Sequence, residues 1–433
     1  MSTSLLKYRG ALAELDPESR RSLLQRASST DTHVTEQVRT VIARVRAEGD
    51  AALFALARQF DRVELAALEV PRVRWDAALA NLSQPLRAAL SRAAGNIARA
   101  HAAQRPRTVE VETEPGVLVG RRPDPLGRVG VYAPGGRAAY PSSVLMGVVP
   151  AKVAGVGEII VCSPPGPNGL PSPGVLAAAA LAGADRVFSL GGAGAVAAMA
   201  YGTPTVPRVD RIVGPGNAYV AAAKLQVVDA VGIDAPAGPS ELLVVADATA
   251  SPEAVAREMV AQAEHDPDAC CVALALGEEL ARAIADAVDR VAGEAKRDAI
   301  VAAALAGQGA VLSVATLDEV WPFVADFAPE HLLIATAAPQ ADLARVRNAG
   351  TVFLGERSSV AFGDYLTGAN HVLPTAGLAR VYSGLSALDF FRWTTYQRVE
   401  RSAAVSLAGD AGAMADAEGL YAHGDAARAW RLG

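Results

Sequence analysis

Gln262 and His265 could hold a metal ion, because imidazole nitrogen is a common zinc ligand and an amide oxygen can complement it. They stand three positions apart in QAEHDP, on one face of a helix that Ser251 and Pro252 are expected to start. Pro267 forbids the continuation of that helix. A zinc site needs about four ligands, and a histidine at a helix C-terminus also complements the helix dipole. A metal site and an ordinary helix end are therefore both open.

Two further segments carry side chains that could transfer protons. Glu330 and His331 are adjacent at the entrance to an apolar strand, where a carboxylate and an imidazole could act as two separate acid–base groups. Their spacing also fits a charged loop residue beside a packed histidine. Asp364 and His371 lie in the Gly-rich segment FGDYLTGANH, and loops of this kind often carry function. A structural loop is the alternative there, and another histidine, His423, lies near the C-terminus.

A glycine-rich turn between a strand and a helix could cradle a pyrophosphate. Gly192 and Gly194 occur in SLGGAGAVAAMA, which has the form of a dinucleotide-binding fingerprint. Asp210 follows 18 positions after Gly192, close to the usual spacing, but it precedes a strand instead of ending one. Similar turns occur in α/β proteins that bind no nucleotide. A second glycine-rich turn, VGPGNAY, contains Asn217, and GPSE places Ser240 at the entrance to another strand.

The order of the expected elements places these residues in an α/β protein. Short apolar strands alternate with Ala-rich helices over 130–240, and the same rhythm returns over 241–336. Apolar strands of this kind are typical of parallel sheets covered on both faces. Helices are expected over 31–61 and 85–106. We therefore expect two parallel-sheet units, preceded by a helical arm and followed by a tail from about residue 385.

The tail contains LDFFRWTTYQ, with Phe390, Phe391, Trp393 and Tyr396 at helical spacing. That is more apolar surface than a short free tail should expose. We expect the tail to pack on a partner.

Composition and charge exclude several classes. The 433 residues carry a formal net charge of −6, which gives no basic footprint for nucleic acid. The N-terminus lacks the apolar region of a signal peptide, and the apolar stretch 174–184 is too short to span a bilayer. Three cysteines cannot form a disulfide framework, and Cys270 and Cys271 are expected to be buried strand thiols. A reducing cytoplasm is the expected location.

Eight short motifs follow one another in order along the chain. They are GVYAPGG, YPSSVLM, VGPGNAYV, GPSE, QAEHDP, APEHL, GDYLTGANHVLPTAG and SGLS. Together they resemble the histidinol dehydrogenase family, densely over 115–390 and then through the tail. The resemblance implies oxidation of L-histidinol through bound L-histidinal to L-histidine, the last steps of histidine biosynthesis, with NAD⁺ and one zinc ion per subunit.

The resemblance also implies roles for single residues. The zinc ligands would be Gln262, His265, Asp364 and His423. The proton-transfer pair would be Glu330 and His331. The substrate contacts would be Ser240, Gln262, His265, His331, Asp364, Glu418 and His423. The nucleotide contacts would be Tyr132 and Asn217. The chain has GGAGA where the family usually has GGAQA, so Gly194 replaces a glutamine that contacts the nucleotide.

The implied architecture is two incomplete Rossmann-like domains, one inserted in the other. An N-terminal arm would cover 1–22, and the first α/β domain, with most of the metal and catalytic site, would cover 23–131 and 241–384. The nucleotide-contacting domain would cover 132–240. The small helical tail, 385–433, would form a homodimer in which it completes the partner's site.

Three other functions fit parts of the sequence. A related NAD-dependent dehydrogenase could act on another small polyol. A zinc hydrolase could use Glu330 as its base without NAD⁺, but would leave the glycine-rich turns unexplained. A catalytically silent small-molecule binding protein could use two α/β lobes, but the proton-transfer pair speaks against it.

Overall fold

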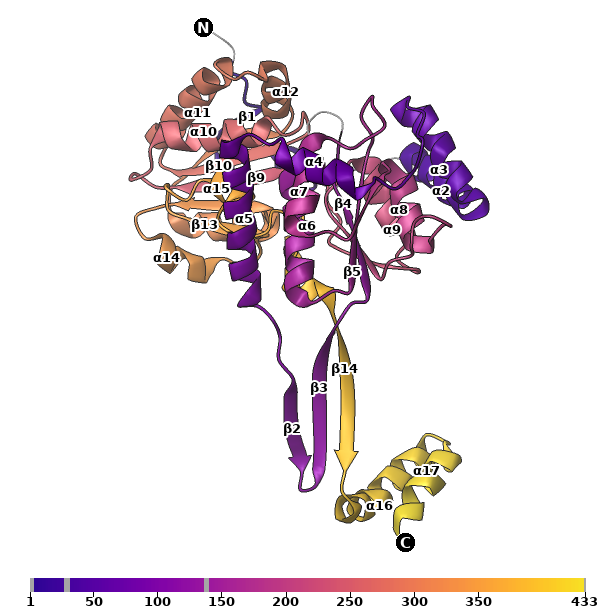
Figure 1. Ribbon diagram of the computed structural model, residues 1–433. Helices are drawn as coiled ribbons and strands as arrows, with labels where there is room; N and C mark the ends of the chain where they lie inside the picture. Colours follow the sequence, from indigo (N-terminus) through magenta and orange to yellow (C-terminus); the bar gives the residue numbers. More distant parts are fainter. Residues whose placement is uncertain (1–3, 27–31, 136–139, 432–433) are drawn as a thin grey trace.

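The structure is a computed structural model that describes residues 4–26, 32–135 and 140–431. Residues 1–3, 27–31, 136–139 and 432–433 belong to segments discussed above and lie outside the described residues. Two lobes stand side by side, and a long stalk leaves them and ends in a pair of helices (Figure 1). Each lobe contains its own parallel sheet.

The first lobe is built on a six-stranded parallel sheet in the order β1-β11-β10-β9-β12-β13. Its strands are β1 Tyr8–Ala11, β9 Glu241–Ala246, β10 Cys270–Leu276, β11 Gly309–Val314, β12 His331–Ala335 and β13 Thr351–Leu354. One face packs on α10 Pro252–Ala263, α11 Glu278–Gly293 and α12 Asp298–Gln308, and the other on α1 Pro17–Leu24 and α13 Val320–Phe327. Burial of both faces explains the continuous apolar strands. Cys270 and Cys271 are buried on opposite faces of β10, as expected.

The second lobe is built on a five-stranded parallel sheet in the order β6-β5-β4-β7-β8. Its strands are β4 Arg128–Tyr132, β5 Glu158–Ser163, β6 Arg186–Ser189, β7 Arg211–Val213 and β8 Gly232–Ile233. One face packs on α2 Thr32–Glu48, α3 Asp50–Leu56, α8 Gly192–Tyr201 and α9 Ala218–Gln226. The other face packs on α4 Arg72–Ala80, α5 Gln84–Ala102, α6 Pro141–Ala154 and α7 Pro173–Ala182.

The two sheets are interleaved in the sequence. All strands of the five-stranded sheet lie between β1 and β9 of the six-stranded sheet, so the second unit is inserted in the first. Helices α2 to α5 pack on the five-stranded sheet, although the sequence suggested that 23–131 belongs with the six-stranded one. The expected domain boundaries stay a prediction.

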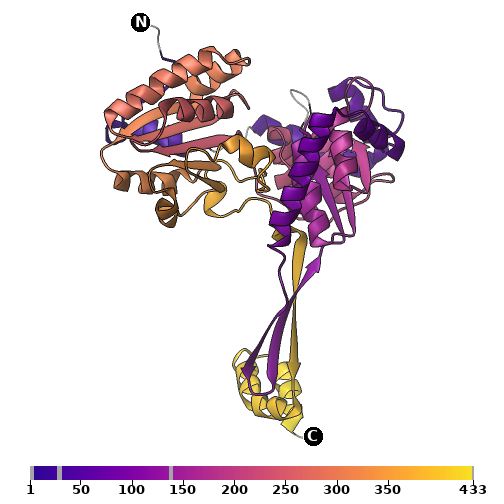
Figure 2. The ribbon, with the colours of Figure 1, turned by 60° about the vertical axis from the view of Figure 1, so that its left-hand side comes forward.

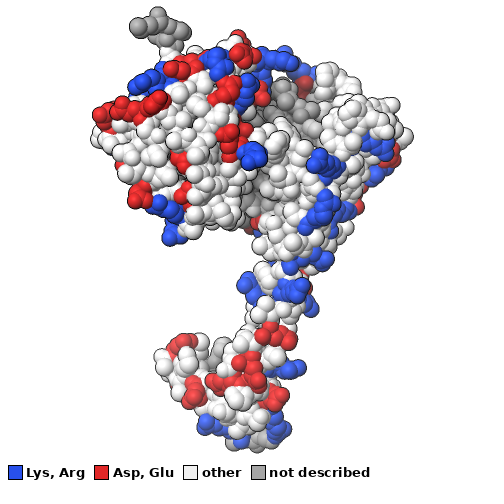
Figure 3. Space-filling view, turned by 90° about the vertical axis from the view of Figure 1, so that its left-hand side faces the viewer, with Lys and Arg blue, Asp and Glu red and all other residues white. Residues whose placement is uncertain are grey.

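The stalk is a three-stranded antiparallel sheet in the order β14-β3-β2. It consists of β2 Val109–Glu114, β3 Val117–Pro125 and β14 Phe391–Val399, and it carries α16 Arg401–Ala417 and α17 Tyr421–Arg428 at its tip. Two views show this helical pair away from both lobes (Figures 1 and 2). The space-filling view shows acidic and basic side chains interspersed on the stalk and tip (Figure 3).

The prediction of helical spacing in LDFFRWTTYQ is wrong. Only Ala387–Phe390 forms a short 3-10 helix, and Phe391–Val399 is strand β14. Its nine residues pair with β3, Arg121 stacks on Trp393 with its guanidinium carbon 4.5 Å from the ring centroid, and Tyr396 lies over Gly120, where a Cβ would overlap its ring. These cross-strand contacts outweigh the local helical pattern.

The remaining elements are short. They are α14 Pro339–Asp342, α15 Val360–Tyr365, a π-helical turn Ala57–Asp61, and the 3-10 turns Leu12–Glu14, Leu317–Glu319, Leu343–Arg345, Leu378–Arg380 and Ala429–Arg431. Among the helices described, none is both long and apolar enough to cross a membrane.

Candidate active site

The helix that carries Gln262 and His265 begins and ends as the sequence predicts. Ser251 caps α10 by accepting from the Ala254 N–H, Pro252 is its first residue, and it ends at Ala263. Gln262 is buried, and its Nε2 has no hydrogen-bond partner within the described part of the chain. His265 is exposed just beyond the helix. A buried amide without a partner beside an exposed imidazole leaves ligand capacity at this helix end.

Glu330 and His331 are both buried at the start of β12. His331 Nδ1 lies 2.9 Å from the carbonyl oxygen of Glu241, and since a carbonyl only accepts, Nδ1 carries a proton. Glu330 Oε2 accepts from the Glu241 N–H at 2.7 Å and lies 3.5 Å from His331 Nδ1. The backbone of Glu241 thus holds both side chains, and the buried Nε2 of the ring has no hydrogen-bond partner among the described residues.

Asp364 faces this pair from α15. Its Oδ1 lies 3.5 Å from His331 Nε2, and its side chain is largely buried. Burial alone would raise the pKa of Asp364, but the nearby His331, His371 and His265 side chains lower it below the ordinary value. His331, at the start of β12, and His265, just after α10, thus both act electrostatically on this carboxylate.

Burial and charge act in opposite directions on the pKa values of Glu330 and His331. Burial raises the pKa of the Glu330 carboxyl, and the neighbouring His331 opposes only part of that effect. Burial by itself would lower the pKa of His331, but the carboxylates of Glu330 and Asp364 outweigh it and raise that pKa well above the ordinary value. The protonation of each group therefore depends on the others.

The loop after α15 joins this site to the second lobe. His371 Nδ1 donates to the Asp364 carbonyl oxygen at 2.8 Å, and its Nε2 lies 3.5 Å from Ser143 Oγ at the start of α6. Asn370 donates to the Met146 carbonyl oxygen at 2.8 Å. Asp364 is consequently supported from the lobe that contains the glycine-rich turns.

Ser240 lies at the edge of the six-stranded sheet where β9 and β12 both begin. It directly precedes β9, is partly buried, and accepts from the Cys270 N–H through its carbonyl oxygen. The Gly238 N–H donates to Thr375 Oγ1 at 2.5 Å, so the segment before β9 lies against the loop that follows His371. The structure therefore gathers Ser240, Asp364 and the residues that begin β12 in one region.

The residues expected to contact the nucleotide lie at the carboxyl edge of the five-stranded sheet. Tyr132 ends β4, and its hydroxyl accepts from the N–H of Gly192 at the start of α8. Burial raises the pKa of Tyr132 to about 12. Asn217 is exposed and caps α9 by accepting from the Tyr219 and Val220 N–H groups. The N-termini of α8 and α9 therefore both lie at the carboxyl edge of the five-stranded sheet.

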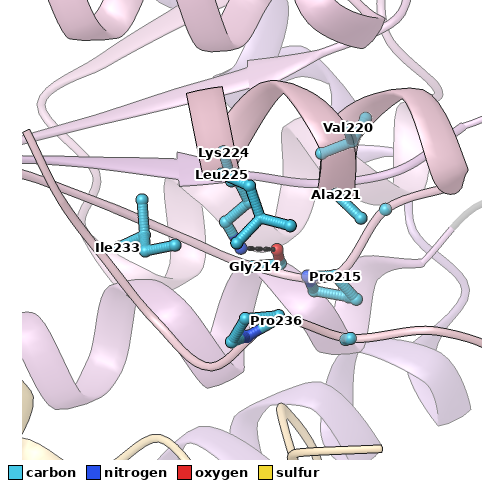
Figure 4. Close-up of a pocket in the computed structure, with 10 residues that line it drawn as sticks. Gly214, Pro215, Val220, Ala221, Lys224, Leu225, Ile233 and Pro236 are labelled. Atoms are coloured by element: carbon cyan, nitrogen blue, oxygen red, sulfur yellow. Dashed lines mark hydrogen bonds between the residues drawn. The ribbon is translucent and has the colours of Figure 1, made fainter. Parts of the chain in front are cut away.

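The turn between β7 and α9 lines a small pocket (Figure 4). Gly214 has φ +115°, and a Cβ there would overlap the Tyr132 carbonyl oxygen. Lys224 Nζ donates to the Gly214 carbonyl oxygen at 2.8 Å, and the Gly214 N–H donates to the Asp234 carboxylate at 2.7 Å. Lys224 and Asp234 also form a buried ion pair, so the turn is fixed on both sides.

Gly194 is buried in the first turn of α8 and does not have positive φ. A Cβ there would lie 3.0 Å from Leu56 Cδ1 and 3.7 Å from Leu53 Cδ2, both on α3. The glycine therefore permits close approach of α3 to α8. A larger side chain could fit only if Leu56 moved.

Glu418 and His423 lie elsewhere. Glu418 follows the last turn of α16, His423 belongs to α17, and both are exposed on the tip of the stalk, away from the lobes (Figures 1 and 2). Within residues 4–26, 32–135 and 140–431, no three His, Cys, Asp or Glu side chains gather as a metal site. A single chain therefore does not bring the tail residues to Gln262, His265 and Asp364.

Sequence reasoning missed the part that Glu241 plays. The motif GPSE drew attention to Ser240, whereas the next residue is the one whose backbone binds Glu330 and His331. A charged residue at the start of the apolar strand ELLVVA was the available signal, since a buried carboxylate needs partners.

Comparison with known proteins gives one consistent result. A family model described as histidinol dehydrogenase matches residues 24–431. The histidinol dehydrogenase of Methanosarcina barkeri is 46% identical over 418 residues, which cover 96% of each chain. That of Natronomonas pharaonis is 48% identical over 416 residues, covering 96% of this chain and 97% of the relative.

A solved structure agrees with the sequence matches. The crystal structure of histidinol dehydrogenase from Elizabethkingia anophelis superposes with a TM-score of 0.95 at 34% identity, covering 100% of this chain and 99% of that one. The chain therefore belongs to the histidinol dehydrogenase family, whose known function is the NAD-dependent oxidation of histidinol to histidine.

Proposed function

We propose that both oxidation steps occur at one site in which Glu330 and His331 transfer protons. The observation that carries the proposal is the buried pair at the start of β12, with His331 Nε2 turned toward Asp364 at 3.5 Å. Membership of a dehydrogenase family speaks against the hydrolase and the silent binding protein, which had no role for NAD⁺.

In the first step, the substrate alcohol loses its O–H proton while a hydride leaves its carbon for NAD⁺. Because the Glu241 carbonyl oxygen binds the proton on His331 Nδ1, Nε2 of the neutral ring is the nitrogen that accepts the alcohol proton. In the second step, water adds to the aldehyde, and a second hydride leaves the hydrate carbon for a second NAD⁺. The Glu330 carboxylate, whose pKa is raised by burial, assists by taking a proton from that water.

A zinc ion fits the residues present. The body of the chain offers the amide of Gln262, whose buried nitrogen lacks a partner among the described residues, the exposed imidazole of His265 and the carboxylate of Asp364. This nitrogen and oxygen set suits zinc without thiolates, and it is one ligand short of four. When bound, zinc would hold the amine and imidazole of histidinol, which is a positioning function.

We further propose that the missing ligand, His423, comes from a second copy of the chain. It lies on α17 and Glu418 directly follows α16, and these two helices form the tip of the stalk, away from the lobes of their own chain (Figure 1). Met414, Leu420, Tyr421 and Trp430 on the same tip are 46–68% exposed, which is apolar surface suited to a partner. An isologous dimer would place each tail at the other subunit's site.

The nucleotide is proposed to bind at the carboxyl edge of the five-stranded sheet, with contacts from Tyr132 and Asn217. The N-termini of α8 and α9 meet at this edge, and such ends favour phosphate. The His371–Ser143 contact joins this edge to the proton-transfer pair.

The product ratio tests the reaction. Histidinol should yield two NADH for each histidine formed, measured by NADH absorbance and by chromatography of the amino acid. A chelator should abolish the reaction and added zinc should restore it. One NADH per substrate without a carboxylate product, or faster turnover of another polyol, would favour the related polyol dehydrogenase instead.

A further inference from the structure

Arg26 is a buried guanidinium whose importance the sequence did not indicate. Its side chain is 3% exposed, its Nε donates to Glu241 Oε1 at 2.8 Å, and its Nη2 donates to Glu241 Oε2 at 3.0 Å. Nη1 donates to the Leu23 carbonyl oxygen at 2.9 Å, and the guanidinium carbon lies 3.5 Å from the centroid of the Phe327 ring. Two parallel bonds and a stacked ring fix the orientation of both partners.

Glu241 connects this ion pair to the proton-transfer pair through its own backbone. Its N–H donates to Glu330 Oε2 at 2.7 Å, and its carbonyl oxygen accepts from His331 Nδ1 at 2.9 Å. Its Oε1 also accepts from the N–H of Ala376, which has φ +56°. Displacement of the Glu241 side chain would therefore shift the peptide groups that orient Glu330 and His331.

A second route leads from Arg26 to Glu330. Nη2 of Arg26 also donates to the carbonyl oxygen of Phe327, the last residue of α13, at 2.6 Å. Ala328 follows with φ +47°, a left-handed conformation that is strained for a residue with a Cβ. The chain then enters β12 through Glu330. Such strain persists where neighbouring contacts hold the backbone, and Arg26 supplies one of them.

Stability alone explains this ion pair poorly. The desolvation free energy of two buried charges is about as large as their Coulombic attraction, so packed apolar residues often stabilise a core equally well. A bidentate pair, however, fixes distance and angle in a way that apolar packing does not. We infer that Arg26 and Glu241 are positioning residues that hold Glu330 and His331 in their reactive geometry. The inference rests on the proton-transfer function proposed above.

A matched pair elsewhere in the chain provides the control. Arg186 makes two bonds to Glu69, at 2.9 and 2.6 Å, and donates to the Thr205 carbonyl oxygen at 3.0 Å. This pair has the same kind of contacts as Arg26, but it lies on the five-stranded sheet and does not contact Glu330 or His331. It is also more exposed. Arg186→Lys should lower the Tm and leave kcat unchanged.

Arg26→Lys keeps the charge and loses the paired geometry. We expect kcat for histidinol to fall by about tenfold or more, with KM for histidinol and NAD⁺ changed by less than about threefold, because reacting groups are misplaced while binding persists. In a His331→Asn background the same change should lower kcat by less than about twofold, since the group being positioned is absent. Glu241→Gln should have the same effect on kcat as Arg26→Lys. If Arg26→Lys does not fold, Glu241→Gln serves as the test variant.

Two other results would overturn the inference. One is an unchanged kcat per folded molecule in Arg26→Lys and Glu241→Gln. The other is an equal fold-loss in the parent and His331→Asn backgrounds, which would mean that Arg26 acts on overall structure. If His331→Asn itself kept full kcat, the proton-transfer assignment would fail, and the inference with it. An impaired His331→Asn beside an active Arg26→Lys would refute the inference alone.

Discussion

His331 Nε2 lies 3.5 Å from Asp364 Oδ1, so the nitrogen proposed as base faces a carboxylate proposed as zinc ligand. The other nitrogen of the ring is held by the Glu241 carbonyl oxygen at 2.9 Å. Proton transfer and metal binding are consequently neighbours, and variants of one need measurement of the other.

His265→Ala should lose both bound zinc and turnover, because it removes an imidazole from the proposed ligand set. Elemental analysis of the purified variant and its rate of NADH formation provide the two readouts. His33→Ala, which changes a histidine on α2, is the matched control and should keep both. Stoichiometric zinc in His265→Ala would show that the ligand assignment is wrong.

The two proton-transfer residues should affect different steps. His331→Asn should slow the alcohol oxidation, since its base is gone, by roughly 10²–10⁴-fold. Glu330→Gln should slow the aldehyde oxidation more, since water activation fails. Supplying histidinal directly to each variant separates the steps. Equal damage to both half-reactions in both variants would contradict this division.

Subunit complementation tests whether the tail acts in trans. His265→Ala and His423→Ala should each be inactive, but a mixture unfolded and refolded together should regain activity. A mixed dimer then contains one site with both histidines intact. If both residues served the same chain, every site would lack one ligand and the mixture would stay inactive.

Gly194→Gln should raise the KM for NAD⁺ and lower the Tm, although it introduces the residue usual in the family. A Cβ at this position lies 3.0 Å from Leu56 Cδ1, and overpacking of this kind costs about 1–3 kcal/mol. Leu56→Ala in the same chain should recover part of both losses. A lower KM in the single variant would instead show that the missing glutamine limits nucleotide binding.

Asp61 should make stability depend on pH. Burial raises its pKa from 3.8 to about 6, so the folded protein keeps this proton while the unfolded chain has already lost it. Its contribution to stability is therefore lost as pH rises from about 4 to 6. Asp61→Asn mimics the protonated form. The Tm of the variant minus that of the parent should increase across this interval, and a constant difference would contradict the shift.

Local signals were sufficient to predict several elements. Ser251 and Pro252 start α10, and the apolar strands around Cys270 and Cys271 form a parallel sheet covered on both faces. Each of these predictions depends on residues close together in the sequence or on a period that repeats.

The errors and omissions arise from distant partners. Strand β14 was predicted to be helical because its aromatic residues match a helical period, but Tyr396 packs on Gly120, which is far away in the sequence. Arg26 gave no signal because Glu241 lies 215 positions away. The assembly of the site from two sheet edges is likewise set by tertiary contacts such as His371 with Ser143.

The length of the stalk has a thermodynamic consequence. Nine residues of β14 extend roughly 30 Å, which carries His423 beyond the surface of its own lobes. If each tail completes the other subunit's zinc site, metal affinity and dimer affinity are linked and must change together. Dilution would then release zinc, and chelation would weaken the dimer, so activity would depend on protein concentration as well as on metal supply.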